Sequence, residues 1–154
     1  MPISPYVRRL REHVGTDVLL IPSAAVVLRD REGRVLLAQD ADSRLWILVG
    51  GAIEIDEAPE EAAVREAAEE VNVTITVRRL LGVASGPECR VRYPNGDETA
   101  YVVIIYEGEI VDGTPRPDNV EVLATRWVDP SELGAIDLSS ITRALLTTAG
   151  LLNS

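Results

Sequence analysis

The sequence predicts an α/β fold in which helices cover a mixed β-sheet. Hairpin-like strand pairs dominate the chain, and an Ala- and Glu-rich helix lies between them. Strands and helices do not alternate at the regular spacing of βαβ units, which favours a mixed sheet over a purely parallel one. With 154 residues, the chain is long enough for one domain with a sizeable core. We expect a leader over residues 1–17 and a single domain over residues 18–154.

The first half of the chain supplies a helix and two strands. Residues 5–14 place apolar side chains at helical spacing and are followed by Gly15, which predicts a short amphipathic leader helix. Residues 24–39 are rich in Val and Leu around an Asp-Arg-Glu-Gly turn and predict a β-hairpin. Residues 46–51 then form an extended segment that leads into a glycine pair.

The next predicted element is a helix over residues 58–71, with Pro59 in its first turn, where proline is tolerated. We expect its inward stripe to consist of Ala62, Ala63, Ala67 and Val71. β-Branched residues and an Asn-Gly turn signal predict the strands that follow. The remaining expected elements are a strand over 73–85, a hairpin over 89–111, a loop over 112–119, a strand over 121–129, a helical turn from Asp129 and a closing helix over 138–151.

Charge and composition exclude several classes of protein. All 15 basic residues are arginine, and the 25 acidic residues give a net charge of −10, so the surface repels nucleic-acid backbones. Aromatic residues make up only 4% of the chain, which leaves no stacking platform for single strands. The single cysteine, Cys89, fits a reducing compartment. Pro22 interrupts the longest apolar stretch, which is short of the ~20 residues of a membrane span. We therefore expect a cytoplasmic protein with no nucleic-acid or membrane partner.

The helix over 58–71 carries an unusual concentration of like charge. Glu66, Glu69 and Glu70 lie at positions i, i+3 and i+4, so they share one helix face. Like charges at that spacing destabilise a helix by roughly 0.2–0.5 kcal/mol per pair. A solvated helix face is one interpretation. The other is a metal site, because the carbonyls of the flexible Gly50 and Gly51 could join the carboxylates as the hard oxygen ligands that Mg²⁺ or Mn²⁺ prefers.

The spacing of these residues resembles the Nudix box of the Nudix hydrolases. The matching positions, in order, are Gly51, Glu57, Arg65, Glu66, Glu69, Glu70 and Val73. Three positions depart from the usual pattern. Val49 stands where a proline commonly precedes the glycines, and Asp56 and Asn72 stand where glycines are usual. We expect Asn72 to end the helix in a left-handed conformation, which Asn and Asp tolerate better than most residues do.

This resemblance implies an α/β/α sandwich with a mixed sheet and an Mg²⁺-dependent activity, with Mn²⁺ as an alternative ion. The implied reaction is hydrolysis of a diphosphate linkage in a nucleoside diphosphate derivative: an ADP-ribose-like compound, a dinucleotide or a nucleotide sugar, ahead of nucleoside triphosphates. Arg65 would orient the glutamates. The implied metal ligands are Glu66, Glu69, Glu70, Glu57 and the carbonyl of Gly50 or Gly51. The alternative is a non-catalytic Nudix-fold module that binds or senses a nucleotide.

Three residues outside the box are further candidates. Glu121 lies six residues before Trp127, the spacing at which this family often supplies another carboxylate, so we expect an extra ligand or general base. An exposed strand-edge charge is the alternative. Arg90 and Arg92 alternate on one strand face and are candidates for binding phosphate or ribose, although solubilising surface arginines would look the same. A homodimer is one assembly that the leader helix could support.

Overall fold

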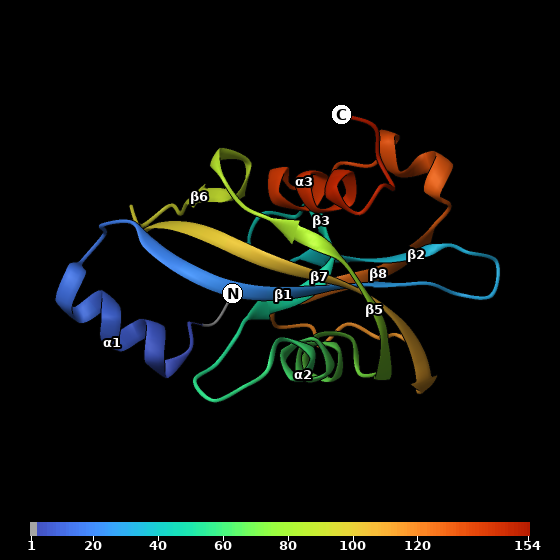
Figure 1. Cartoon of the computed structure of the whole chain (residues 1–154), viewed down its shortest axis with the longest axis horizontal. Coiled ribbons are helices and arrows are strands. Elements are labelled where there is room, and N and C mark those ends of the chain that lie inside the picture. Colours follow the sequence, from blue (N-terminus) through green and yellow to red (C-terminus); the bar gives the residue numbers. More distant parts are fainter. Residues whose placement is uncertain (1–2) are drawn as a thin grey trace.

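The computed structural model describes residues 3–154 and has the predicted α/β/α arrangement (Figure 1). Helix α2 (Pro59–Val71) covers one side of the strands, and α3 (Ser140–Thr148) covers the opposite side. Helix α1 (Pro5–Val14) lies beyond the end of the strands, and none of its residues is buried. No helix within residues 3–154 is both long enough and apolar enough to cross a membrane.

The strands of residues 3–154 form two sheets. β1 runs parallel to β7, and the other pairs are antiparallel, so the larger sheet is mixed as expected. The smaller sheet is antiparallel throughout. The larger sheet has the order β4 (Val49–Ala52), β1 (Leu19–Leu28), β7 (Glu98–Asp112) and β5 (Thr74–Ala84), with β6 (Arg90–Arg92) also paired to β7, and the smaller has the order β3 (Trp46–Ile47), β2 (Val35–Asp40) and β8 (Val122–Val128).

The predicted hairpin over residues 24–39 is wrong. The chain does reverse where expected, since the Asp30 N–H donates to the Arg34 carbonyl at 3.1 Å. Pairing stops after a single bridge between Arg29 and Val35, and β1 and β2 then enter different sheets. β1 instead pairs along its whole length with β7, a partner distant in sequence. Because β1 is buried on both faces, each edge of it needs a partner strand, and a local turn signal does not reveal which strand that is.

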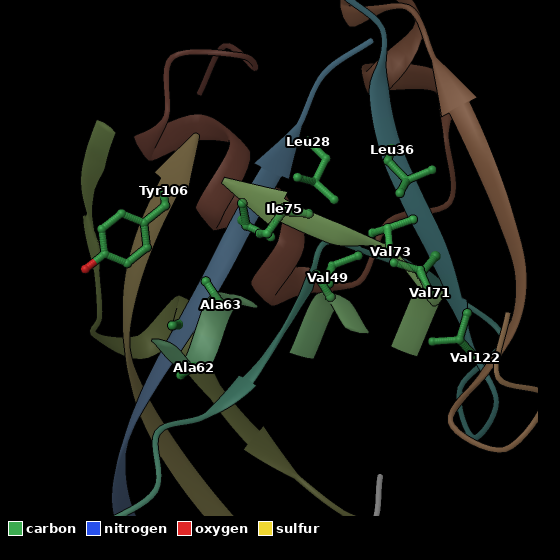
Figure 2. Packing of buried hydrophobic residues seen from close by; sticks show 14 residues of the cluster. Leu28, Leu36, Val49, Ala62, Ala63, Val71, Val73, Ile75, Tyr106 and Val122 are labelled. Atoms are coloured by element: carbon green, nitrogen blue, oxygen red, sulfur yellow. The ribbon is translucent and has the colours of Figure 1, made fainter. Parts of the chain in front are cut away.

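Small side chains bring α2 close to the strands. The predicted inward stripe of α2 is confirmed, because its three alanines and Val71 are fully buried. Figure 2 shows Ala62, Ala63 and Val71 together with side chains from both sheets, including Leu28 of β1 and Leu36 of β2. A second apolar cluster fills the side that α3 covers. The strands thus lie between two apolar cores. The core on the α2 side packs this helix against β4.

The ends of α2 are defined by local contacts. At its start, the Ala58 N–H donates to the Glu61 carboxylate at 2.9 Å. At its end, Asn72 has φ 60° and ψ 37°, so the expected left-handed conformation is confirmed, and Asp56 has φ 64°. The remaining predicted elements are found, but α3 is shorter than the predicted helix over 138–151. It begins after Ser139, whose side chain accepts from the Thr142 N–H, and it ends before Gly150, which has φ 78°.

Candidate active site

Two buried glutamates of α2 face the glycine pair of β4. Glu66 is 8% exposed and Glu70 is 2% exposed, although charged residues are almost never buried without partners. The Gly50 N–H points at Glu70 Oε2 across 3.4 Å. A Cβ on Gly51 would lie 2.7 Å from the Glu66 Cδ, and a Cβ on Gly50 would overlap the backbone of β1. Glycine at position 50 therefore lets β4 lie close to the backbone of β1, and glycine at position 51 leaves the space that the end of the Glu66 side chain occupies.

Arg65 connects three glutamates and the backbone of β4. Its Nε and Nη2 donate to the two oxygens of Glu57 at 2.7 and 3.0 Å, which is a bidentate ion pair. Its Nη1 donates to Glu66 Oε1 at 2.9 Å and to Glu69 Oε2 at 3.2 Å, and Nη2 also donates to the Ala52 carbonyl at 3.0 Å. The hydrogen bonds from Arg65 lower the pKa of Glu57. Arg65 thus contacts the glutamates that the family resemblance expects it to orient, and its orienting role stays a prediction.

Burial and mutual repulsion raise the pKa values of the carboxyl groups around Glu70. Burial is the main cause that raises the pKa of Glu70 well above its usual value, followed by the negative charges of Glu66 and Glu121. Burial also raises the pKa of Glu66, against the opposing effect of Arg65. The pKa of Glu121 is raised by burial and by Glu66. The structure therefore brings Glu121 into the electrostatic field of the box glutamates, and such perturbed pKa values are typical of functional sites.

The loop before β8 presents Glu121 in a fixed backbone conformation. The Glu121 carbonyl accepts from the Ala41 N–H at 2.9 Å. Asp118 Oδ1 accepts from the N–H groups of Val120, Glu121 and Val122 at 3.0, 3.0 and 2.9 Å. The family resemblance does not point to Asp118, although an Asp followed by Asn after a proline is an Asx-turn signal that could have identified it.

The donor set at this site suits a hard divalent cation, because it consists of carboxylate and carbonyl oxygens. In the present arrangement Arg65 holds Glu66 and Glu69, and the Glu69 side chain is 54% exposed. No three His, Cys, Asp or Glu side chains within residues 3–154 converge closely enough to hold an ion as they stand. Coordination would require the glutamates to turn away from Arg65, so the metal-ligand assignment stays a prediction.

Arg90 and Arg92 are not brought together with the glutamates. Both are exposed on β6, which lies on the α3 side of the strands, whereas the glutamates lie on α2 (Figure 1). Arg90 Nη2 donates to Glu98 Oε2 at 2.6 Å, and this contact lowers the pKa of Glu98. Their role in substrate binding stays a prediction.

Known proteins resemble this chain in sequence and in fold. The model of the NUDIX domain matches residues 19–148. A MutT-like protein of Streptomyces ambofaciens is 30% identical over 128 residues, which cover 83% of this chain and 75% of that protein. The nucleoside triphosphatase NudI of Klebsiella pneumoniae (strain 342) is 31% identical over 132 residues, which cover 81% of this chain and 94% of that protein.

Among solved structures, the MutT protein from Methanosarcina mazei Go1 has a TM-score of 0.72 at 21% identity, and the match covers 87% of this chain and 95% of that one. This likeness shows the same fold. The family model spans most of the chain, and the sequence relatives cover most of their own lengths. The protein therefore belongs to the NUDIX domain family and is a Nudix hydrolase.

Proposed function

We propose that the protein is an Mg²⁺-dependent hydrolase that cleaves the diphosphate linkage of a nucleoside diphosphate derivative. The class includes ADP-ribose-like compounds, dinucleotides and nucleotide sugars. One observation carries the proposal: Glu66 and Glu70 are buried side by side against Gly50 and Gly51, with raised pKa values. Buried carboxylates of like charge are unfavourable unless a proton or a cation offsets the charge. A divalent ion is the partner that their oxygen atoms suit.

In this proposal Glu66, Glu69 and Glu70 hold the ion with a carbonyl of the glycine pair, and Glu57 lies nearby as an additional ligand. When bound, the ion polarises the diphosphate and lowers the pKa of the attacking water. The contacts of Arg65 fall into two groups, since it binds Glu57 and the Ala52 carbonyl in addition to the α2 glutamates. Glu57 and the carbonyl can therefore keep the guanidinium in place while Glu66 and Glu69 turn.

Glu121 is proposed as the extra ligand or general base. Its raised pKa suits a group that accepts a proton from water at neutral pH. Its backbone is held by Asp118 and Ala41, which keeps its position in the loop defined. Attack of the water oxygen on phosphorus forms one P–O bond and breaks another. The proton of the water goes to the base, and the two halves of the substrate leave as separate phosphate-containing products.

Electrostatics favour the less charged class of substrate. The protein carries a net charge of −10, and Arg65, the only basic residue of the box, is already engaged by three glutamates. A diphosphate with an organic group at both ends carries fewer negative charges than a nucleoside triphosphate, so it meets less repulsion. Nucleoside triphosphates are the second candidate, because the Klebsiella pneumoniae relative is named a nucleoside triphosphatase.

The proposal also includes a cytoplasmic location and a homodimer. The single, unpaired Cys89 favours a reducing compartment. The leader helix α1 has no buried residue, so its surface is free to contact a second copy of the chain. Size measurement in solution would test the dimer.

A substrate panel tests the proposed reaction. ADP-ribose, a dinucleoside diphosphate, a nucleotide sugar and several nucleoside triphosphates are incubated with Mg²⁺ or with EDTA, and the products are separated by anion exchange. We expect Mg²⁺-dependent cleavage of diphosphate derivatives into two phosphate-containing products. Faster release of diphosphate from a triphosphate would favour the second candidate. Nucleotide binding by calorimetry without any turnover would favour the non-catalytic binding module instead.

A further inference from the structure

We propose that Asn72 is a positioning residue. Its side-chain amide ties the loop over residues 113–121 to the C-terminal end of α2 and thereby holds Glu121 beside the glutamates of that helix. The tether is a property of the fold. Its catalytic consequence rests on the proposed function, in which Glu121 takes part in the reaction.

The backbone conformation of Asn72 does not require an asparagine side chain. With φ 60° and ψ 37°, the residue is in the left-handed region that glycine adopts more readily than any other residue. Its N–H closes the helix by donating to the Ala67 carbonyl, which glycine would do equally well. The side chain makes the additional contact, because Asn72 Nδ2 donates to the Arg116 carbonyl at 3.0 Å.

Two backbone hydrogen bonds flank this side-chain contact. The Arg116 N–H donates to the Val71 carbonyl at 3.0 Å, and the Asp118 N–H donates to the Glu70 carbonyl at 3.1 Å. These carbonyls belong to the last turn of the helix, where no partner exists within the helix itself. Several hydrogen bonds join residues 59–72 to the loop 113–121. Among those that the structure of residues 3–154 describes, only the Asn72 contact is made by a side chain. It is therefore the contact that a substitution can remove.

The tether leads directly to Glu121. Asp118, whose N–H is bound to the Glu70 carbonyl, uses its own carboxylate to hold the N–H groups of residues 120–122. The main-chain carbonyl of Glu70 thus holds the turn at Asp118. This turn places Glu121 near the side chain of Glu70. Asn72 secures the segment just before that turn. Loss of the amide donor should loosen the loop at residue 116 and widen the range of Glu121 positions.

Amide hydrogen exchange of the metal-free protein tests the tether. In Asn72→Gly, we expect several-fold faster exchange at Arg116, Asp118 and residues 120–122, with little change in melting temperature because glycine suits the backbone. Asn72→Asp keeps the shape and the tolerance of left-handed backbone but lacks the donor, so the same acceleration is expected. Asp56→Gly is the matched control, since φ is 64° there and its side chain makes no hydrogen bond to this loop. Exchange at wild-type rates in both Asn72 variants would overturn the proposal.

Kinetics test whether the tether acts through Glu121. We expect Asn72→Gly to lower kcat roughly tenfold with KM unchanged, as loss of a group that orients a ligand does. In a Glu121→Gln background the same substitution should cause no further loss, because the residues act as one unit. If the two substitutions lowered kcat independently, so that their effects multiplied, Asn72 would not act by positioning Glu121. A wild-type protein that hydrolyses nothing would refute the proposed function, while the exchange rates would still decide the tether.

Discussion

At Gly51 the absence of a side chain decides where the Glu66 carboxylate can lie. The space that a Cβ would occupy is filled by the end of the Glu66 side chain, which is itself buried and held by Arg65. A side chain at position 51 would therefore compete with the Glu66 carboxylate for the same space. The site thus depends on a position that carries no functional group of its own.

Gly51→Ala should therefore displace Glu66 while leaving the fold intact. Overpacking of this kind costs about 1–3 kcal/mol, and we expect a melting temperature lowered in proportion together with a large loss of turnover. Gly134→Ala is the matched control, because a Cβ there would meet only Leu152 at 3.9 Å. Thermal melts and initial rates of both variants check this. Turnover in Gly51→Ala equal to that of the control would show that Glu66 need not lie where it does.

Single residues of the box were predictable where backbone conformation is a local property. Asn72 and Asp56 replace glycines of the usual pattern, and both have the left-handed backbone that this implies. Glu121 could be predicted to lie near Glu70 only through the family resemblance, which gives meaning to its spacing from Trp127. The Pro-Asp-Asn sequence around Asp118 indicates a turn, but only the folded loop shows that this turn holds the N–H of Glu121.

At the scale of elements, α2 was predictable and the partner of β1 was not. The proline in the first turn and the alanine stripe of α2 are signals carried within a few residues. The pairing of β1 with β7 joins segments some 80 residues apart, whereas the turn after β1 suggests β2. A turn signal predicts where the chain reverses, but it does not predict which strands then pair through hydrogen bonds. The closing helix is shorter than predicted because Leu138 and Leu151, which pack on the core, lie outside α3.

At the scale of the whole molecule, stability and metal binding are linked through the buried carboxyl groups. Glu66, Glu70 and Glu121 have pKa values raised in the folded state. A raised pKa means that the folded protein binds the proton more tightly than the unfolded chain does. The contribution to stability is therefore complete below the unfolded pKa and is lost as the pH rises through the folded pKa.

We predict that the free energy of unfolding of the metal-free protein falls over the pH range above the ordinary pKa of a glutamate carboxyl, because the pKa values of these three groups are raised. Mg²⁺ should reverse the fall by replacing the proton, with a gain of about 2.7 kcal/mol when its free concentration is a hundredfold above Kd. Urea titrations across this range, with Mg²⁺ and with EDTA, would measure both effects. The carboxyls with lowered pKa, such as Glu57, lose their contribution only at lower pH. A stability that is indifferent to Mg²⁺ at the upper end of the range would argue against a metal site.

Glu70 is proposed as the central metal ligand, so the Glu70→Gln variant should lose metal-dependent hydrolysis. Glutamine keeps the size of the side chain and removes a buried charge, so we expect a folded protein with an unchanged or higher melting temperature. Its Mg²⁺-dependent turnover should fall by roughly a hundredfold or more, because the central ligand is lost. Glu12→Gln, on the exposed face of α1, is the control and should retain wild-type turnover. Full Mg²⁺-dependent turnover in the Glu70→Gln protein would show that Glu70 is not an essential ligand.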